Sequence, residues 1–139
     1  MTLGTATSLR EGQLLAQAGV DAAIAQGAEA GAHRGTFAGE DAPVPTLDLV
    51  RDLASHLTVP VIAAGGIITG RDIARALRAG AKAVQMGTAF LACDEAGTSA
   101  PYREALVDAH GEQTVLTRPA ARPEDCATPS SIASASATS

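Results

Sequence analysis

Apolar and amphipathic segments alternate in the same order along most of this chain. Four short apolar runs predict strands at residues 3–7, 20–25, 59–64 and 81–86. The run from Val59 to Ala64 is apolar throughout, which is typical of a strand that is buried on both faces. Pro60 fits only at the start of that strand, where its missing N–H costs the sheet least.

The segments that follow these runs have the spacing of amphipathic helices. Ser8, with Glu11 three residues later, predicts a capping box at the start of the first helix, and Gly19 is suited to end that helix. Thr46 is predicted to cap the second helix. Each of these signals places a helix directly after a predicted strand or loop.

The second half of the pattern continues in the same way. Thr69, with Asp72 three residues later, predicts the start of a third helix, and a last helix is predicted from about Pro101 to Gly111. The order is therefore strand and helix in strict alternation. That order favours parallel strands joined by right-handed helical crossovers, which is the α/β class.

A long segment without periodicity, residues 26–45, separates the second strand from the second helix. Loops of this length in a compact domain are usually functional. His33 in this loop is a candidate general base, because an imidazole exchanges a proton near neutral pH. The alternative is a solvent-exposed loop histidine beside an ordinary surface arginine, Arg34.

Two glycine-containing turns follow the third and fourth predicted strands, at residues 64–67 and 85–88. Ligands of parallel α/β folds lie at the carboxyl ends of the strands, where glycines let backbone N–H groups approach a phosphate. Thr88 adds a hydroxyl donor to the second turn. The pair predicts a phosphate or nucleotide-cofactor site; the alternative is that the glycines only form tight turns.

Composition narrows the function classes. The chain has 139 residues, a formal charge of −5 and no cluster of basic residues, which argues against nucleic-acid binding. The longest nearly apolar run, residues 59–68, is too short to span a bilayer, and the first residues lack a signal-peptide pattern, so a cytoplasmic location is predicted. Cys93 and Cys126 lack metal-ligand or disulfide-framework spacing.

Taken together, these residues resemble the C-terminal half of the nitronate monooxygenase family, formerly called 2-nitropropane dioxygenases. The resemblance covers roughly Leu3 to Arg118. Its most specific block is Gln26-Gly27-Ala28-Glu29-Ala30-Gly31-Ala32-His33-Arg34-Gly35, whereas the Gly65-Gly66 and Gln85-Met86-Gly87-Thr88 turns are shared by many phosphate-binding barrels.

The resemblance implies an α/β fold made of about four β/α units, the C-terminal half of an FMN-binding (β/α)₈ TIM barrel. It implies oxidation of alkyl nitronates or nitroalkanes by O₂ to a carbonyl compound and nitrite. The family's catalytic base falls on His33. Its flavin contacts fall on Gln26, Gly31, Gly66, Gln85, Met86, Gly87 and Thr88, and no metal is implied.

The chain departs from the family pattern at three points. It begins where the family's fifth strand would begin, and Ala32 stands where a second glycine is usual. Residues 119–139 are rich in Ser, Ala, Thr and Pro and are predicted to be a disordered or aberrant tail, after a partial flavin-binding barrel at 1–118. A half-barrel has open strand edges, so self-association or an N-terminal half-barrel partner is expected.

Two other functions remain open from the sequence. The first is an FMN-type enoyl-acyl-carrier-protein reductase, a related barrel that takes electrons from a nicotinamide donor. The second is a truncated half-barrel without catalytic activity of its own.

Overall fold

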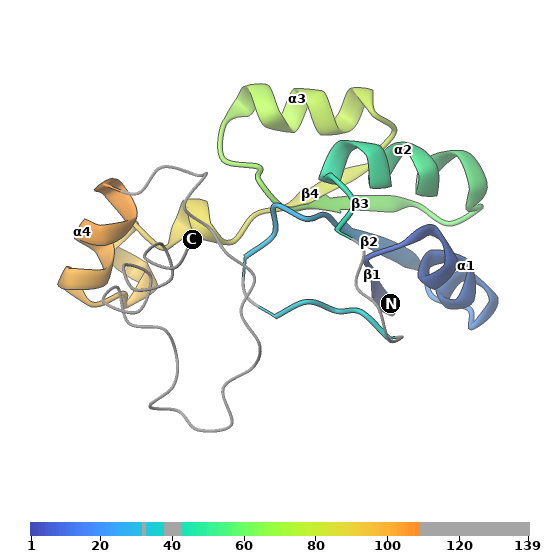
Figure 1. Ribbon diagram of the computed structural model, residues 1–139, viewed down its shortest axis with the longest axis horizontal. Coiled ribbons are helices and arrows are strands. Elements are labelled where there is room, and N and C mark those ends of the chain that lie inside the picture. The colour runs from blue at the N-terminus through green and yellow to red at the C-terminus, as the bar shows by residue number, and fades with distance from the viewer. Residues whose placement is uncertain (32, 38–42, 109–139) are drawn as a thin grey trace, which may run out of the picture. The chain divides into compact units, whose positions relative to one another are not determined.

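The computed structural model of this chain describes residues 1–31, 33–37 and 43–108 (Figure 1). Strands and helices alternate as the sequence predicts. The elements of the first part of the chain are β1 (Leu3–Ala6), α1 (Leu9–Gln17), β2 (Ala22–Gln26), α2 (Thr46–His56), β3 (Val61–Ala64), α3 (Gly70–Arg78) and β4 (Ala83–Gln85). Two short 3₁₀ turns follow, η1 (Thr88–Phe90) and η2 (Asp94–Ala96).

The last helix, α4 (Ala100–Asp108), belongs to a second compact unit that begins at Thr98. Its start agrees with the helix predicted from Pro101. The predicted end of that helix at Gly111 and the predicted tail at 119–139 lie outside the described residues. Unit 1, Met1–Gly97, contains the whole sheet.

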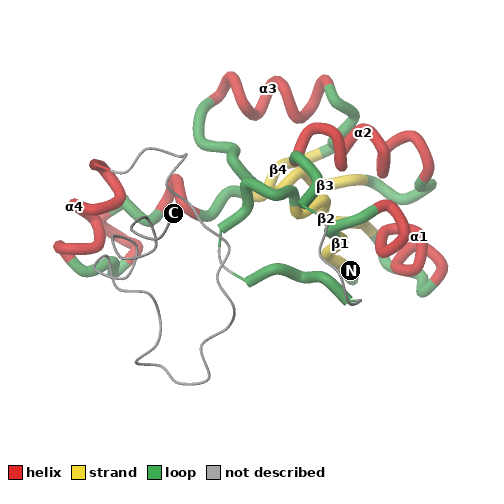
Figure 2. Tube along the Cα trace, in the orientation of Figure 1, coloured by secondary structure: helices red, strands yellow, loops and turns green. Residues whose placement is uncertain are grey.

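The four strands form one parallel sheet in the order β1-β2-β3-β4, which confirms the α/β class. Figure 2 shows these strands in yellow. Its register sorts the residues into rows across the sheet. One row, Ala6, Ala25, Ala63 and Val84, packs toward the helices. Because successive side chains of a strand point to opposite faces, the next row, Gln26, Ala64 and Gln85, belongs to the other face at the carboxyl ends of its strands.

Helices α1, α2 and α3 lie along the same side of the sheet (Figure 1). The centre of the core is α2, where Leu49, Val50 and Leu53 are fully buried. They pack against small strand residues such as Ala25 and Ala63. Small side chains on the sheet let the helix come close, so the aliphatic side chains of α2 fill the space between them.

Shortening a core leucine of α2 is expected to cost far more stability than shortening an exposed one. Leu53→Ala should lower the free energy of unfolding by about 2–5 kcal/mol, because it leaves a cavity in a fully packed site. The matched control Leu77→Ala, on α3 and 46% exposed, should cost less than about 1 kcal/mol. Urea unfolding followed by circular dichroism measures both; equal losses would contradict this packing.

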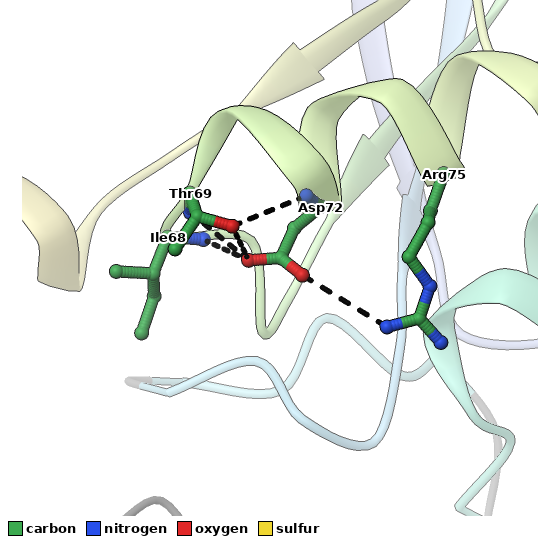
Figure 3. Close-up of polar contacts among 4 residues, drawn as sticks. All are labelled: Ile68, Thr69, Asp72 and Arg75. Atoms are coloured by element: carbon green, nitrogen blue, oxygen red, sulfur yellow. Dashed lines mark hydrogen bonds and ion pairs between the residues drawn. The ribbon is translucent and has the colours of Figure 1, made fainter.

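The starts of α1, α2 and α3 differ from one another. In α3 the predicted capping box is confirmed: Asp72 Oδ2 accepts from Thr69 N at 2.9 Å and from Thr69 Oγ1 at 2.7 Å (Figure 3). Arg75 Nη1 lies 3.9 Å from the other Asp72 oxygen. The hydrogen bonds from the side chain and backbone of Thr69 hold the pKa of Asp72 below its ordinary value.

The predicted cap of α2 is wrong. Thr46 is the first residue of the helix, and the N-cap position is Pro45, whose side chain makes no capping hydrogen bond. Instead Thr46 donates from its backbone N at 2.8 Å and from Oγ1 at 2.7 Å to Glu29 Oε2. A carboxylate from the long loop thus supplies the acceptor that the helix start needs.

The predicted capping box of α1 is half formed. Ser8 Oγ accepts from Glu11 N at 3.3 Å, but the carboxylate of Glu11 does not return to Ser8. One of its oxygens, Oε2, accepts from Thr7 N at 2.6 Å and Thr7 Oγ1 at 2.8 Å. The other, Oε1, accepts from Thr36 Oγ1 at 3.0 Å and from Phe37 N at 2.7 Å.

Burial alone would raise the pKa of the Glu11 carboxyl. The hydrogen bonds from Phe37, Thr7 and Thr36 outweigh it and hold that pKa below its ordinary value of 4.5. A carboxyl whose pKa is lower in the folded state stabilises the fold fully above its unfolded pKa. That contribution is lost as the pH falls through the folded pKa.

We therefore expect Glu11→Gln to destabilise the protein by about 1–3 kcal/mol at pH 7. The gap in unfolding free energy between the two proteins should shrink as the pH falls below 4.5, because protonated Glu11 loses the same interaction. Urea unfolding between pH 7 and pH 3 measures the gap. Asp72→Asn removes the other carboxyl whose pKa is lowered, so this control shows how much of the pH dependence comes from Asp72. A gap between wild type and Glu11→Gln that stays constant with pH would refute the expectation.

Candidate functional site

The residues singled out in the sequence lie at the carboxyl ends of the strands or in the loops that follow them. Gln26 is the last residue of β2 and Gln85 the last residue of β4, and both are in register with Ala64 at the end of β3. Parallel strands end on the same side, so the loops that follow them start from one line. Gln85, like Gly66, Gly87 and Thr88 beyond the strands, is exposed.

The loop after β2 reaches the turns that follow both β3 and β4. Gly27 N donates to Ala64 O at 3.0 Å, which continues the sheet by one residue. Farther along, a methyl group on Gly31 would lie 3.8 Å from Thr88 Oγ1, and one on Gly66 would lie 3.0 Å from Glu29 Cβ. The structure thus brings the β2 loop against both of the turns predicted to bind phosphate.

The turn after β3 needs its glycines for backbone reasons. Gly65 has φ of +118° and Gly66 of +64°, and a side chain on Gly65 would come within 2.8 Å of both Ala30 N and Thr46 Oγ1. Both glycines are therefore needed to form a tight turn. The turn is compatible with ligand binding, because it leaves Gly66 exposed at the edge of the sheet.

Gly87 is different. Its φ of −117° is available to any residue, and a methyl group there would meet no atom within 4 Å in the described part of the chain. Neither backbone conformation nor packing explains a glycine at this position. The next residue, Thr88, is the first residue of η1; it is exposed and carries a hydroxyl group. The open space beside Gly87 is what the close approach of a ligand would require.

His33 lies in a segment, residues 33–37, that is held mainly through its backbone. Gln26 Nε2 donates to His33 O at 2.9 Å, and Gln26 Oε1 accepts from Gly35 N at 2.7 Å. The residue His33 itself is exposed. Next to this histidine, Ala32 stands where the family usually has a second glycine. Ala32 lies outside the described residues.

Three side chains near His33 have roles that the sequence did not suggest. Arg34 is half-buried, and its Nη1 donates to Gly27 O at 2.8 Å, so it is not an ordinary surface arginine. Gln26 is engaged with the loop backbone, and Glu11 binds the far end of the same segment. No spacing pattern could reveal these contacts, because each joins parts of the chain that only the fold brings together.

Met86 is the one predicted contact whose side chain turns away. It is half-buried and packs against the core, so only its backbone is available at the sheet edge. A hollow of about 200 Å³ lined by Leu47, Arg51, Arg75, Arg78 and Ala79 lies between α2 and α3, on the helical side. None of the residues that line it is a predicted site residue.

Within 1–31, 33–37 and 43–108, no three or more His, Cys, Asp or Glu side chains are grouped as metal ligands would be. In the same ranges no helix has the length and apolar character needed to cross a bilayer.

Comparison with known proteins gives a consistent picture. A profile of the nitronate monooxygenase family matches residues 1–127. A nitronate monooxygenase from Pseudomonas aeruginosa is 54% identical over 114 residues, which cover 81% of this chain and 32% of that protein. One from Paraburkholderia phytofirmans is 48% identical and is covered to 32%. The chain thus spans about a third of the length of the curated relatives it matches.

Solved structures agree in fold. Nitroalkane oxidase from Streptomyces ansochromogenes matches with a TM-score of 0.74 and 46% identity, over 78% of this chain and 32% of that one. FabK from Thermotoga maritima matches with a TM-score of 0.74 and 40% identity, over 83% and 35%. Both are TIM barrels, so the four β/α units correspond to part of such a barrel. By sequence and by fold, this chain belongs to the nitronate monooxygenase family of oxidoreductases.

Proposed function

We propose that this chain carries the FMN-phosphate side and the catalytic base of an enzyme that oxidises alkyl nitronates or nitroalkanes with O₂ to a carbonyl compound and nitrite. The observation that carries the proposal is the meeting of the β2 loop, which bears His33, with the turns after β3 and β4. Membership in an oxidoreductase family supports it, and the general use of flavin in this family supports the cofactor.

The residues at the strand ends fit a flavin phosphate. Gly87 leaves open space that a methyl group would fill, and exposed Thr88 offers a hydroxyl beside it. Backbone N–H groups of Gly66, Gly87 and Thr88 would donate to phosphate oxygens, as they do in related anion sites. Gln26, Gly31, Gln85 and the Met86 backbone would lie nearer the ring. When bound, FMN supplies the acceptor for the substrate's electrons.

His33 supplies the proton chemistry in this proposal. Its imidazole takes the proton from the carbon next to the nitro group, the C–H bond breaks, and the electron pair remains on the substrate as the nitronate. A preformed nitronate has already lost this proton and does not need the base. Because Gln26 holds the main chain on both sides of Arg34, the backbone that carries His33 has a defined place.

A partner is expected on the sheet face opposite the helices. Leu3 is 43% exposed there, and Ile24 and Ile62 are half-buried in the same alternating set. We propose that self-association or a second, N-terminal half-barrel covers this face. Sedimentation velocity at micromolar concentration should show species larger than a monomer, and a single sharp monomer boundary would count against self-association.

The phosphate turn can be tested with a matched pair of glycine variants. Gly66→Ala and Gly19→Ala both force alanine into positive φ, at +64° and +82°, but only Gly66 lies at the proposed site. After addition of FMN and desalting, the unaltered chain should keep the visible flavin bands. Gly66→Ala should weaken FMN binding about tenfold or more, and Gly19→Ala should not. A colourless unaltered chain would refute cofactor binding by these residues alone.

The role of His33 is tested with two substrates. His33→Ala should slow the oxidation of a nitroalkane about 100-fold or more, while oxidation of the preformed nitronate changes far less. His56→Ala, at the end of α2, is the control histidine. Oxygen uptake and nitrite release measure both reactions. Bleaching of bound flavin by NAD(P)H would instead favour the enoyl reductase, and bound flavin without any turnover would favour a non-catalytic half-barrel.

A further inference from the structure

We propose that Glu11 is a positioning residue that fixes residues 33–37 against the end of β1 and thereby holds His33 in place. The functional part of this inference rests on the base role proposed for His33. The structural part, which concerns the backbone of the segment, stands independently of it.

The carboxylate of Glu11 joins two parts of the chain that are far apart in sequence. The residue is 5% exposed, on the first turn of α1. Its Oε2 binds the backbone and hydroxyl of Thr7, just after β1, whereas its Oε1 binds Thr36 Oγ1 and Phe37 N. One oxygen therefore serves the start of α1, and the other serves the His33 segment alone.

Glu11 and Gln26 hold this segment at successive points. Gln26 binds His33 O and Gly35 N, and Glu11 then binds Thr36 and Phe37. Between them the backbone lies against β1, where a methyl group on Gly35 would come within 2.8 Å of Thr5 Cγ2. Side chains from α1 and β2 thus fix a segment without secondary structure of its own along its described length.

Only a carboxylate can satisfy this set of donors. The backbone N–H groups of Thr7 and Phe37 cannot turn into acceptors, and each faces a different oxygen of Glu11. A glutamine in the same place has one acceptor oxygen and one NH₂ group. One of the two backbone N–H groups would then face a donor, so Glu11→Gln must release one side of the contact.

A purely local role is the competing interpretation, because a carboxylate in the first turn also stabilises a helix start. The two oxygens allow a matched pair of variants. Thr7→Val removes one donor from Oε2 and leaves the contacts to the segment, whereas Thr36→Val removes one donor from Oε1. Both replace a hydroxyl by a methyl group on the same carboxylate.

The first measurement is amide hydrogen exchange by NMR on the full chain. Glu11→Gln should speed exchange about tenfold or more at Phe37 or at Thr7, whichever N–H faces the NH₂ group of the glutamine. Thr36→Val should speed exchange at Phe37 by a smaller factor, and Thr7→Val should change Phe37 less than about twofold. Thr36→Val decides the matter if Glu11→Gln fails to fold. Exchange unchanged at both Phe37 and Thr7 in Glu11→Gln, or unchanged at Phe37 in Thr36→Val, would overturn the proposal.

The second measurement separates positioning of the base from general support of the fold. With FMN present, Glu11→Gln should lower kcat for a nitroalkane about tenfold while kcat for the preformed nitronate changes less than about twofold. Equal losses on both substrates would reduce Glu11 to a structural residue and overturn the positioning role. If the unaltered chain turns over neither substrate, the proposed function fails, and the exchange data alone decide whether Glu11 fixes the segment.

Discussion

The parallel pairing of four strands in sequence order is the constraint on which the rest of this structure depends. Because every strand runs the same way, every strand-to-helix loop leaves from one edge, and residues as distant as Gln26 and Gln85 fall into one row. The helices pack against one face of the sheet and bury it. The packed core thus lies on one face of the sheet, and the row of Gln26, Ala64 and Gln85 belongs to the opposite face.

Carboxylates connect the long loop to this frame. Glu29 reaches from the loop to the first residue of α2, and Glu11 reaches from α1 to the loop. Both accept backbone N–H groups that have no partner in regular secondary structure. Hydrogen bonds to these charged groups therefore hold the described parts of the loop at Thr36, Phe37 and Thr46.

Most of the fold could be predicted from the sequence, because strands and helices are set by periodicity and by signals within a few residues. The Thr69–Asp72 capping box is such a local signal and is confirmed. The prediction for Thr46 is wrong because its acceptor, Glu29, lies seventeen residues earlier. The residues of the segment that Glu11 contacts, Thr36 and Phe37, lie 25 and 26 residues away, so no local spacing pattern indicates these contacts. The sequence predicts both glycine turns, but only the fold distinguishes Gly65, which the backbone requires, from Gly87, which it does not.

The contacts of Gln26 have a consequence for how such a site can change over time. Its amide binds a carbonyl and an N–H of the segment, that is, atoms that every residue other than proline possesses. The path of the main chain at position 33 is therefore independent of which side chain stands there. A lineage can therefore replace the side chain at position 33 and keep the main-chain path that presents it.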